Sequence, residues 1–252
     1  MNAAEKKNGT MERSVDSARM EEILSAGLTA LSIPCTEETL RAFRRYYTLL
    51  DEKNRQMNLT AINGESETAR LHFLDCAAIL PLLPPGPLSV LDVGSGAGFP
   101  GLVLKLLRPD LSLTLLDSQN KRVLFQQEVC DALNLGDVTC LSLRAEEAPA
   151  AMRESFDVVV SRAVARLNVL SELCLPFVKP GGLFLSMKGS AAAEELEESR
   201  RAFRLLGGGN ASLRTCPVPG LDAERAVIRV EKTNPTSAAY PRRFAQIKKQ
   251  PL

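Results

Sequence analysis

Three glycines on alternate positions mark the stretch of this chain that is best suited to receive a ligand. Gly94, Gly96 and Gly98 follow the apolar run Ser89–Val93, and Pro100 comes two positions after Gly98. Glycine permits a tight turn and a close approach to the backbone, and proline suits the first turn of a helix. The pattern therefore predicts a buried strand, a ligand-binding loop and the start of a helix.

An acidic residue ends the next apolar run. Asp117 follows Leu113–Leu116, and an acid about 20 residues beyond such a loop is placed to hold the hydroxyls of a ribose. Loop and acid together predict a nucleoside cofactor. Phe99 stands where a G-x-G-x-x-G dinucleotide loop has its third glycine. An NAD site and a turn without a ligand stay open as alternatives.

Polar residues also end the later apolar runs, at the edge of the sheet where ligands bind in α/β proteins. Ala145 and Glu146 follow the third run and could bind the edge of an adenine, although Glu146 judged by itself favours the start of a surface helix. Arg162 ends the fourth run, where it could face cofactor and substrate or form only a surface ion pair. Lys188 ends the fifth run and could point into a substrate groove.

Two groups of cations suggest contacts with nucleic acid. Lys121 and Arg122 begin a predicted helix, where positive charge opposes the helix dipole, so a phosphate contact would explain them. Tyr240, Arg242 and Arg243 combine an aromatic ring with cations, which suits phosphates and unstacked bases. The alternatives are a solvated helix end and a solubilising tail.

Other polar residues favour structural roles. His72 and Asp75 share one face of a predicted helix, and a lone helical histidine is more often a hydrogen-bonded packing residue than a chemical group. One His, and six Cys without a C-x-x-C pair, make a metal site improbable, and we expect reduced cysteines. A run of acids is typical of a solvated helix face: Glu194, Glu195, Glu197 and Glu198.

Strands and helices alternate through the middle of the chain, which predicts a parallel sheet covered on both faces. The predicted strands are Ser89–Val93, Leu113–Leu116, Val138–Leu143, Phe156–Ser161 and Gly182–Lys188. The predicted helices are Pro100–Leu107, Lys121–Leu133, Leu167–Phe177 and Ala191–Leu206. Two last strands, Ala211–Pro217 and Arg225–Glu231, are joined by a loop too short for a parallel crossover, so they pair antiparallel. This is the layout of class I methyltransferases: a Rossmann-like, mostly parallel seven-stranded sheet with a C-terminal antiparallel hairpin.

The remaining segments complete the expected organisation. We expect a disordered leader over residues 1–16, a small helical region over 17–86, the methyltransferase domain over 87–232 and a basic arm over 233–252. Within the helical region we expect a third helix over Ser66–Leu83. A net charge of +1 excludes a global basic field, so any RNA-binding surface must be local. The chain has neither a long apolar span nor a signal peptide, and we expect a cytoplasmic monomer.

Several motifs, in the order in which they occur along the chain, resemble those of one protein family. They are Asn58-Leu59-Thr60, His72-x-x-Asp75, VLDVGSGAGFPG, LLDSQNKRVLF, RAEE, FDVVVSRAVARL, Lys188-Gly189 and Tyr240-Pro241-Arg242. From about Glu21 onward the chain resembles the bacterial small-subunit ribosomal RNA guanine-N7 methyltransferases, also called the glucose-inhibited division protein B family. Cys76, where the family usually has Ser, and the leader depart from the pattern.

The resemblance implies S-adenosylmethionine as the methyl donor and a guanine in the decoding-region loop of 16S rRNA as the acceptor. The implied partner is the small ribosomal subunit or its assembly intermediate. Arg162 and Lys188 are expected to position the substrate, with no general base. The expected cofactor-binding residues are Asp92, Gly94, Gly96, Gly98, Phe99, Asp117, Ser118, Ala145, Glu146 and Arg162. The expected RNA-binding residues are Lys121, Arg122, Arg166, Tyr240, Arg242 and Arg243. A small-molecule methyltransferase and a non-catalytic ribosome-assembly factor are the alternatives.

Overall fold

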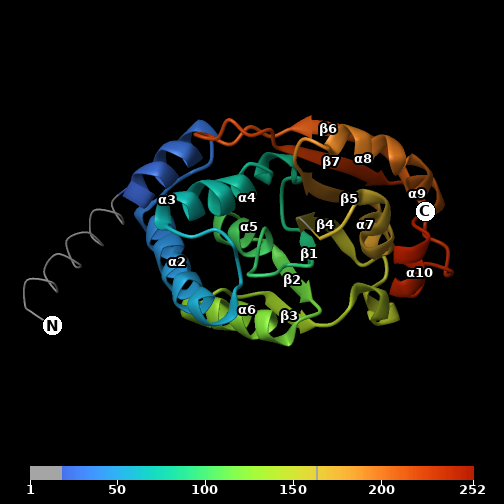
Figure 1. Ribbon diagram of the computed structural model, residues 1–252, viewed down its shortest axis with the longest axis horizontal. Coiled ribbons are helices and arrows are strands. Elements are labelled where there is room, and N and C mark those ends of the chain that lie inside the picture. The colour runs from blue at the N-terminus through green and yellow to red at the C-terminus, as the bar shows by residue number, and fades with distance from the viewer. Residues whose placement is uncertain (1–18, 163) are drawn as a thin grey trace, which may run out of the picture.

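A seven-stranded sheet forms the centre of the molecule (Figure 1). The computed structural model describes residues 19–162 and 164–252, so the expected leader lies outside the described residues. The strands lie in the order β3-β2-β1-β4-β5-β7-β6, and only the pairs β5–β7 and β7–β6 are antiparallel. The expected class I methyltransferase topology, including the antiparallel hairpin, is confirmed. The strands are β1 Ser89–Val93, β2 Ser112–Asp117, β3 Val138–Ser142, β4 Phe156–Arg162, β5 Val178–Lys188, β6 Gly208–Thr215 and β7 Ala226–Lys232.

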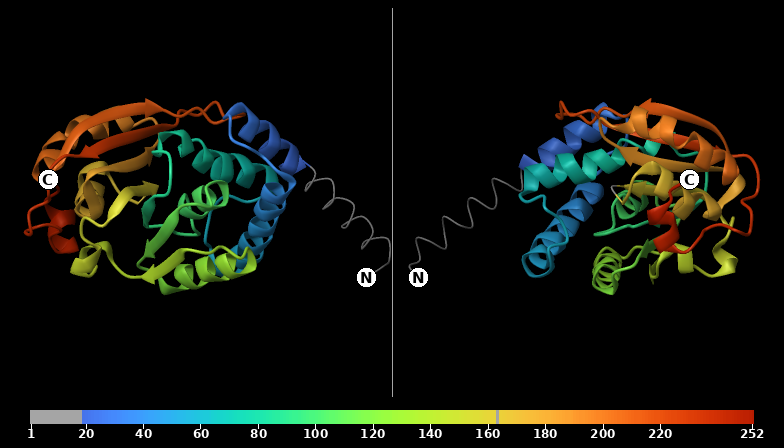
Figure 2. Two further views of the ribbon diagram at one scale, coloured as in Figure 1. Left: turned by 180° about the vertical axis from the view of Figure 1, so that it is seen from behind. Right: turned by 45° about the vertical axis from the view of Figure 1, so that its right-hand side comes forward.

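The two faces of the sheet bury separate apolar clusters, because side chains alternate along each strand. Val90 of β1 belongs to one cluster and its neighbour Leu91 to the other. Figure 2 shows the helices in layers on either side of the sheet. One face carries α2 Glu37–Met57, α4 Asp75–Ala77, α5 Gly101–Leu107 and α6 Asn120–Ala132. The other carries α7 Leu167–Cys174, α8 Ala192–Glu198, α9 Arg200–Leu205 and α10 Phe244–Lys249.

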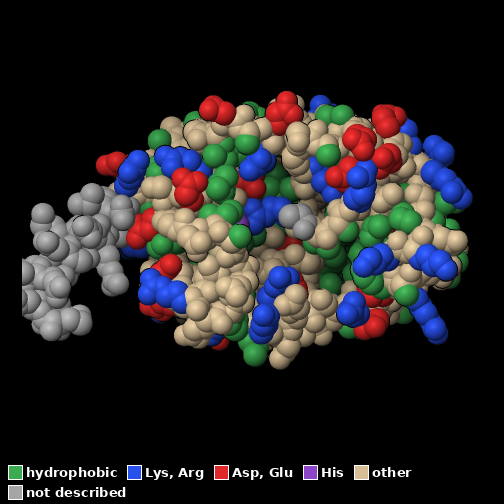
Figure 3. Space-filling view, in the orientation of Figure 1, with side chains coloured by type: hydrophobic (Ala, Val, Ile, Leu, Met, Phe, Trp, Pro, Cys, Tyr) green, Lys and Arg blue, Asp and Glu red, His purple; other side chains and the backbone are tan. Residues whose placement is uncertain are grey.

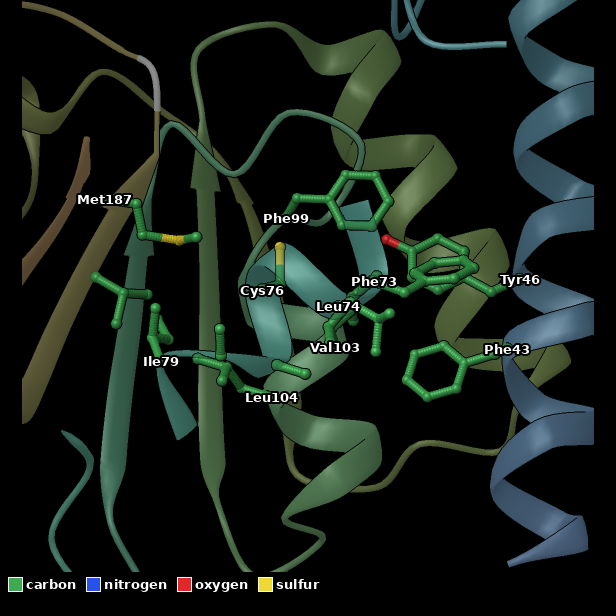
Figure 4. Close-up of a cluster of buried hydrophobic side chains, with 14 of the residues drawn as sticks. Phe43, Tyr46, Phe73, Leu74, Cys76, Ile79, Phe99, Val103, Leu104 and Met187 are labelled. Carbon is green, nitrogen blue, oxygen red and sulfur yellow. The ribbon is translucent and has the colours of Figure 1, made fainter. Parts of the chain in front are cut away.

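The N-terminal helical segments continue the first apolar cluster. Residues 19–30 are helical, and α2 follows with Thr36 as its N-cap, whose hydroxyl accepts from the Thr39 N–H. In Figure 4, Phe43 and Tyr46 of α2 lie beside Phe73 and the loop residue Phe99. These helices and the sheet therefore share one core.

Two predicted helices differ in detail from the structure. The segment expected as one helix over Ser66–Leu83 consists of α3 Glu65–Thr68, a π-helical turn Ala69–Leu74, α4 and a 3-10 turn Leu80–Leu82. A π-helical turn holds one more residue per turn than a periodic pattern assumes. The helix expected over Ala191–Leu206 divides into α8 and α9 at Ser199, a residue type that favours helix ends.

The prediction that residues 233–252 form an arm outside the core is wrong, because the end of the chain packs against α7 and the second apolar cluster. Ile247 of α10 is fully buried in the second cluster. Arg242 forms a bidentate pair with Glu172 of α7, whose side chain is fully buried, with Nη2–Oε2 at 2.6 Å. Arg153 donates to the carbonyls of Ser237 and Tyr240, at 2.8 and 2.6 Å. A polar composition suggested an arm, but the buried side chain of Ile247 and the pairing of Arg242 with Glu172 attach this segment to the core.

Candidate functional site

A cleft of about 780 Å³ opens at the edge of the sheet where the parallel strands end. Figure 3 shows it as the hollow at the centre of this face, with Lys and Arg side chains around it. The glycine loop after β1, the tips of β4 and β5, the N-terminal helices and the start of β7 all contribute to its lining. Its described cations are Arg122, Arg162, Arg166, Lys188 and Arg225. The cleft is therefore positively charged in a chain that is nearly neutral overall.

The glycine loop forms as the sequence predicts. Gly94 and Ser95 donate their N–H groups to the carbonyl of Leu116, which fixes the loop to the end of β2. Gly94 has φ +74°, and a side chain there would collide with Val164. Gly96 has φ +59°, and the nearest atom to an added Cβ would be the Gly94 carbonyl oxygen at 4.0 Å. The loop thus presents open space at Gly96 that a ligand can enter.

Asp117 lies beside this loop at the end of β2. Its Oδ2 accepts from the Gly96 N–H at 3.0 Å, and its Oδ1 accepts from the Gln119 N–H at 2.8 Å. The guanidinium of Arg122 lies 3.3 Å from Oδ2, so this residue is directed at the acid rather than free at the surface. The sequence placed the acid correctly, and its link to the backbone of the loop is a further finding.

The other expected cofactor residues occupy two different positions. Asp92 is fully buried behind the loop, where Oδ2 accepts from the Gly101 N–H at 2.8 Å. Its Oδ1 has no partner within the described part of the chain, and burial raises the pKa of Asp92 from 3.8 to about 7. Ser118, Ala145 and Glu146 follow β2 and β3 at the same sheet edge but outside the cleft lining. Asp92 therefore supports the loop from behind instead of facing the cleft.

Arg162 is held in the cleft by a set of contacts from the N-terminal helices. Its guanidinium donates to the Leu71 carbonyl at 3.1 Å, to Asp75 Oδ2 at 3.2 Å and to His72 Nδ1 at 2.8 Å. Asp75 Oδ1 in turn accepts from Arg225 at 3.0 Å. His72 and Asp75 thus fix Arg162. The expectation that His72 is a hydrogen-bonded packing residue fits its buried position and its bonds, but its partner Arg162 was not predicted. The spacing His72-x-x-Asp75 was the available signal.

The same contacts define the protonation of His72. A guanidinium only donates, so Nδ1 accepts and the proton sits on Nε2, which donates to Thr60 Oγ1 at 2.8 Å. Burial, followed by the charge of Arg162, lowers the pKa of His72 from 6.5 to about 3. His72 is therefore neutral and fully engaged, so it supplies no free proton acceptor.

Phe99 connects the glycine loop to this group. Its ring stacks on the His72 imidazole, with centroids 4.3 Å apart and planes at 11°. The Arg162 guanidinium lies 5.1 Å from the same ring, within range of a cation–π contact. Tyr46 also stacks on Phe99, with ring centroids 5.3 Å apart, and donates its hydroxyl to the Ala97 carbonyl at 2.6 Å. Phe99 is thus fixed by aromatic contacts from two helical segments.

Lys188 ends β5 in the cleft wall, as expected. Its Nζ donates to the Ala165 carbonyl at 2.7 Å and lies 2.8 Å from Glu195 Oε2. The Glu195 side chain is only 12% exposed and also accepts from the Leu167 N–H. The prediction of a solvated face is therefore wrong for Glu195, because α8 turns this residue toward the tip of β5.

The expected RNA-binding residues separate into different environments. Lys121 is exposed, whereas Arg166 at the cleft pairs with Glu194 and Glu198 at 3.2 and 2.6 Å. Tyr240, Arg242 and Arg243 do not line the cleft. The guanidinium of Arg242 already neutralises buried Glu172, and its contact with RNA stays a prediction. Arg243 is exposed next to it.

No group of His, Cys, Asp or Glu side chains within the described ranges could hold a metal ion. In those same ranges no helix is long and apolar enough to cross a membrane.

Comparison with known proteins places these features in one family. The family model described as "rRNA small subunit methyltransferase G" matches residues 39–222. Proteins of the same name from Acetivibrio thermocellus and Geobacillus thermodenitrificans are 40% and 43% identical to this chain. The alignments cover 93% and 90% of this chain and 97% of each relative.

Solved structures support the fold. A chain of the Haloferax volcanii complex between the Trm112 activator and a methyltransferase aligns with a TM-score of 0.54 at 16% identity. It covers 75% of this chain and 98% of its own. An S-adenosylmethionine-dependent methyltransferase from Aquifex aeolicus aligns with a TM-score of 0.50 at 20% identity, over 64% of this chain and 92% of its own.

Proposed function

The chain belongs to the rRNA small subunit methyltransferase G family, and on that premise we propose that it methylates N7 of a guanine in 16S rRNA. It is an S-adenosylmethionine-dependent methyltransferase. The observation that carries the proposal is the composition of the cleft, where the glycine loop meets a wall of cations. Such a wall suits the phosphates of an RNA segment, which a neutral small substrate would not require.

The residues of the loop fit the cofactor. Open space in front of Gly96 admits a ligand to the backbone, and Asp117 provides carboxylate oxygens at the same place for the ribose hydroxyls. Ala145 and Glu146 follow the neighbouring strand β3, where we place the adenine. Bound there, the cofactor supplies a methyl group that its sulfonium already activates.

The acceptor atom explains why the cleft needs no general base. Guanine N7 carries a lone pair and no proton, so nothing has to be removed before it attacks a methyl group. His72 matches this requirement, because both of its ring nitrogens are committed to Arg162 and Thr60. The protein then contributes orientation of N7 and exclusion of water.

Arg162 and Lys188 are the residues that we assign to positioning. The side chain of Arg162 is 17% exposed and is fixed on three sides, so its position costs little further entropy when a substrate binds. A cation directly at N7 would block the reaction, and we therefore assign Arg162 to a phosphate of the RNA. Lys121, exposed at the start of α6, and Arg122 beside it extend the positive surface.

We propose that the enzyme acts as a monomer in the cytoplasm, on the small subunit or an assembly intermediate. The target guanine must be presented unstacked, because N7 has to reach the bottom of a cleft. The decisive experiment incubates the protein and S-adenosylmethionine with small subunits that lack the modification, and in parallel with naked 16S rRNA. Nucleoside mass spectrometry then counts 7-methylguanosine.

A gain of one 7-methylguanosine per 16S molecule supports the proposal, and the better substrate identifies the stage of assembly. No gain on either substrate, with cofactor binding demonstrated, would refute it. Arg162→Lys should lower turnover more than it weakens cofactor binding, because we assign Arg162 to a phosphate of the RNA. Arg200→Lys is the matched control, because Arg200 is exposed and pairs only with Glu197 among the described residues.

A further inference from the structure

The cleft contains a carboxylate with one oxygen that accepts no hydrogen bond from the described residues. Asp75 and Glu195 are the acidic residues of its described lining. Both oxygens of Asp75 are bonded, to Arg225 and to Arg162. Glu195 engages only Oε2, which accepts from the Leu167 N–H at 2.7 Å and contacts Lys188. Its Oε1 makes no hydrogen bond to any described residue and remains available to a ligand.

Lys188 and Glu195 present a donor and an acceptor side by side. Their side chains are 8% and 12% exposed, and the Lys188 Nζ lies 2.8 Å from Glu195 Oε2. The ammonium also donates to the Ala165 carbonyl, which leaves its third proton without a described partner. Because each group is anchored by the fold, the pair can recognise a ligand without first being ordered.

This arrangement complements one purine edge. Guanine presents the O6 acceptor next to N7, followed by the N1–H donor. Resting on the proposed function, we infer that Lys188 donates to O6 and that Glu195 Oε1 accepts the N1–H, so that the pair selects guanine. Adenine offers an amino donor and a lone pair at the same places, which would oppose both groups. Neither contact uses N7, which stays free to face the methyl donor.

Substrates with modified target bases distinguish recognition of the base by Lys188 and Glu195 from a purely structural role of these residues. The rRNA substrate carries guanine, inosine or 2-aminopurine at the target position, and kcat/KM for methyl transfer is measured for each. Inosine keeps N7, O6 and N1–H, so it serves as the matched control. 2-Aminopurine keeps N7 but lacks O6 and N1–H. We expect the wild type to prefer guanine to 2-aminopurine by about 100-fold or more, since hydrogen bonds to charged groups are lost.

Glu195→Gln is the informative variant. Its amide can donate to the N1 lone pair of 2-aminopurine, so the preference for guanine should fall by about 10-fold or more. Inosine should follow guanine in every variant, and the affinity for S-adenosylmethionine should not change. Glu197→Gln is the control, because that carboxylate lies on the same helix with its side chain 64% exposed. If Glu195→Gln does not fold, Glu195→Asp carries the same test by withdrawing the acceptor.

The outcomes distinguish two failures. If the Glu195 variants lose activity equally on all three bases, the residue only supports Lys188 and α7, and the inference is overturned. If the wild type forms no 7-methylguanosine from the guanine substrate, the proposed function fails instead. A preference for guanine that falls only in the Glu195 variants establishes the recognition.

Discussion

The only histidine of the chain provides a direct test of the site geometry. Burial and the charge of Arg162 lower the pKa of His72 from 6.5 to about 3. Between these values the unfolded chain binds a proton that the folded protein does not. The stability that neutral His72 contributes is therefore fully present above pH 6.5, and the free energy of unfolding decreases as the pH falls toward 3. At pH 5.0 the loss amounts to about 2 kcal/mol, from 1.5 pH units at about 1.4 kcal/mol each.

Two measurements check this value. Because one imidazole is present, its NMR signals need no assignment, and they should report the Nε2–H tautomer with no titration between pH 8 and pH 5. Denaturant unfolding of the wild type and His72→Gln should be compared at pH 7.5 and pH 5.0. The wild type should be the more stable at pH 7.5, and its advantage should shrink by about 2 kcal/mol at pH 5.0.

The comparison with His72→Gln removes an opposing effect. Asp92, with its pKa raised by burial, stabilises the fold as the pH falls over the same range, but it is present in both proteins. A stability difference that does not change with pH would contradict the reasoning. So would an imidazole that titrates near 6.5 or carries its proton on Nδ1, because Arg162 would then have lost its acceptor.

Three further outcomes follow from buried groups. The wild type should lose stability as the pH rises from 3.8 to about 7, because the folded protein holds the Asp92 proton over this range and the unfolded chain does not. Denaturant titration should show a loss of about 2 kcal/mol of unfolding free energy between pH 5.5 and 8.5, and Asp92→Asn should remove it. Arg242→Ala should cost about 3–5 kcal/mol of unfolding free energy by leaving buried Glu172 uncompensated, whereas exposed Arg243→Ala should change it by less than about 0.5 kcal/mol. Gly98→Ala should lower Tm and weaken S-adenosylmethionine binding in calorimetry, since φ is +97° and the new Cβ would collide with neighbouring side chains. An unchanged Tm would show that the loop adapts to the methyl group.

The sequence predicted the parts of the site that depend on local pattern. Strand β1 has the predicted bounds, because a run buried on both faces is apolar at successive positions. Asp117 was found from its place after the second run, since parallel strands end at one edge of the sheet. Arg162 and Lys188 were found in the same way and do line the cleft.

The missed features depend on contacts between residues far apart in the chain. Arg242 and Glu172 are separated by 70 positions, and Glu195 and Leu167 by 28. A charged residue type predicts exposure by default, so it takes a distant partner to reverse that expectation. The partner of each of these charges is visible only once the helices are placed. The same limit explains why the hydrogen bond between His72 and Arg162, 90 positions apart, was not predicted.

The N-terminal helices form part of the cleft rather than an attachment to the methyltransferase fold. Tyr46 donates to the carbonyl of Ala97, and His72 stacks on Phe99, so both hold the glycine loop. The carbonyl of Leu71 and the side chain of His72 also hold Arg162, which comes from β4. Any shift of these helices must therefore disturb the glycine loop and Arg162 together. The boundary expected at residue 86 divides the chain by composition, but the chemistry of the cleft requires residues from both sides of it.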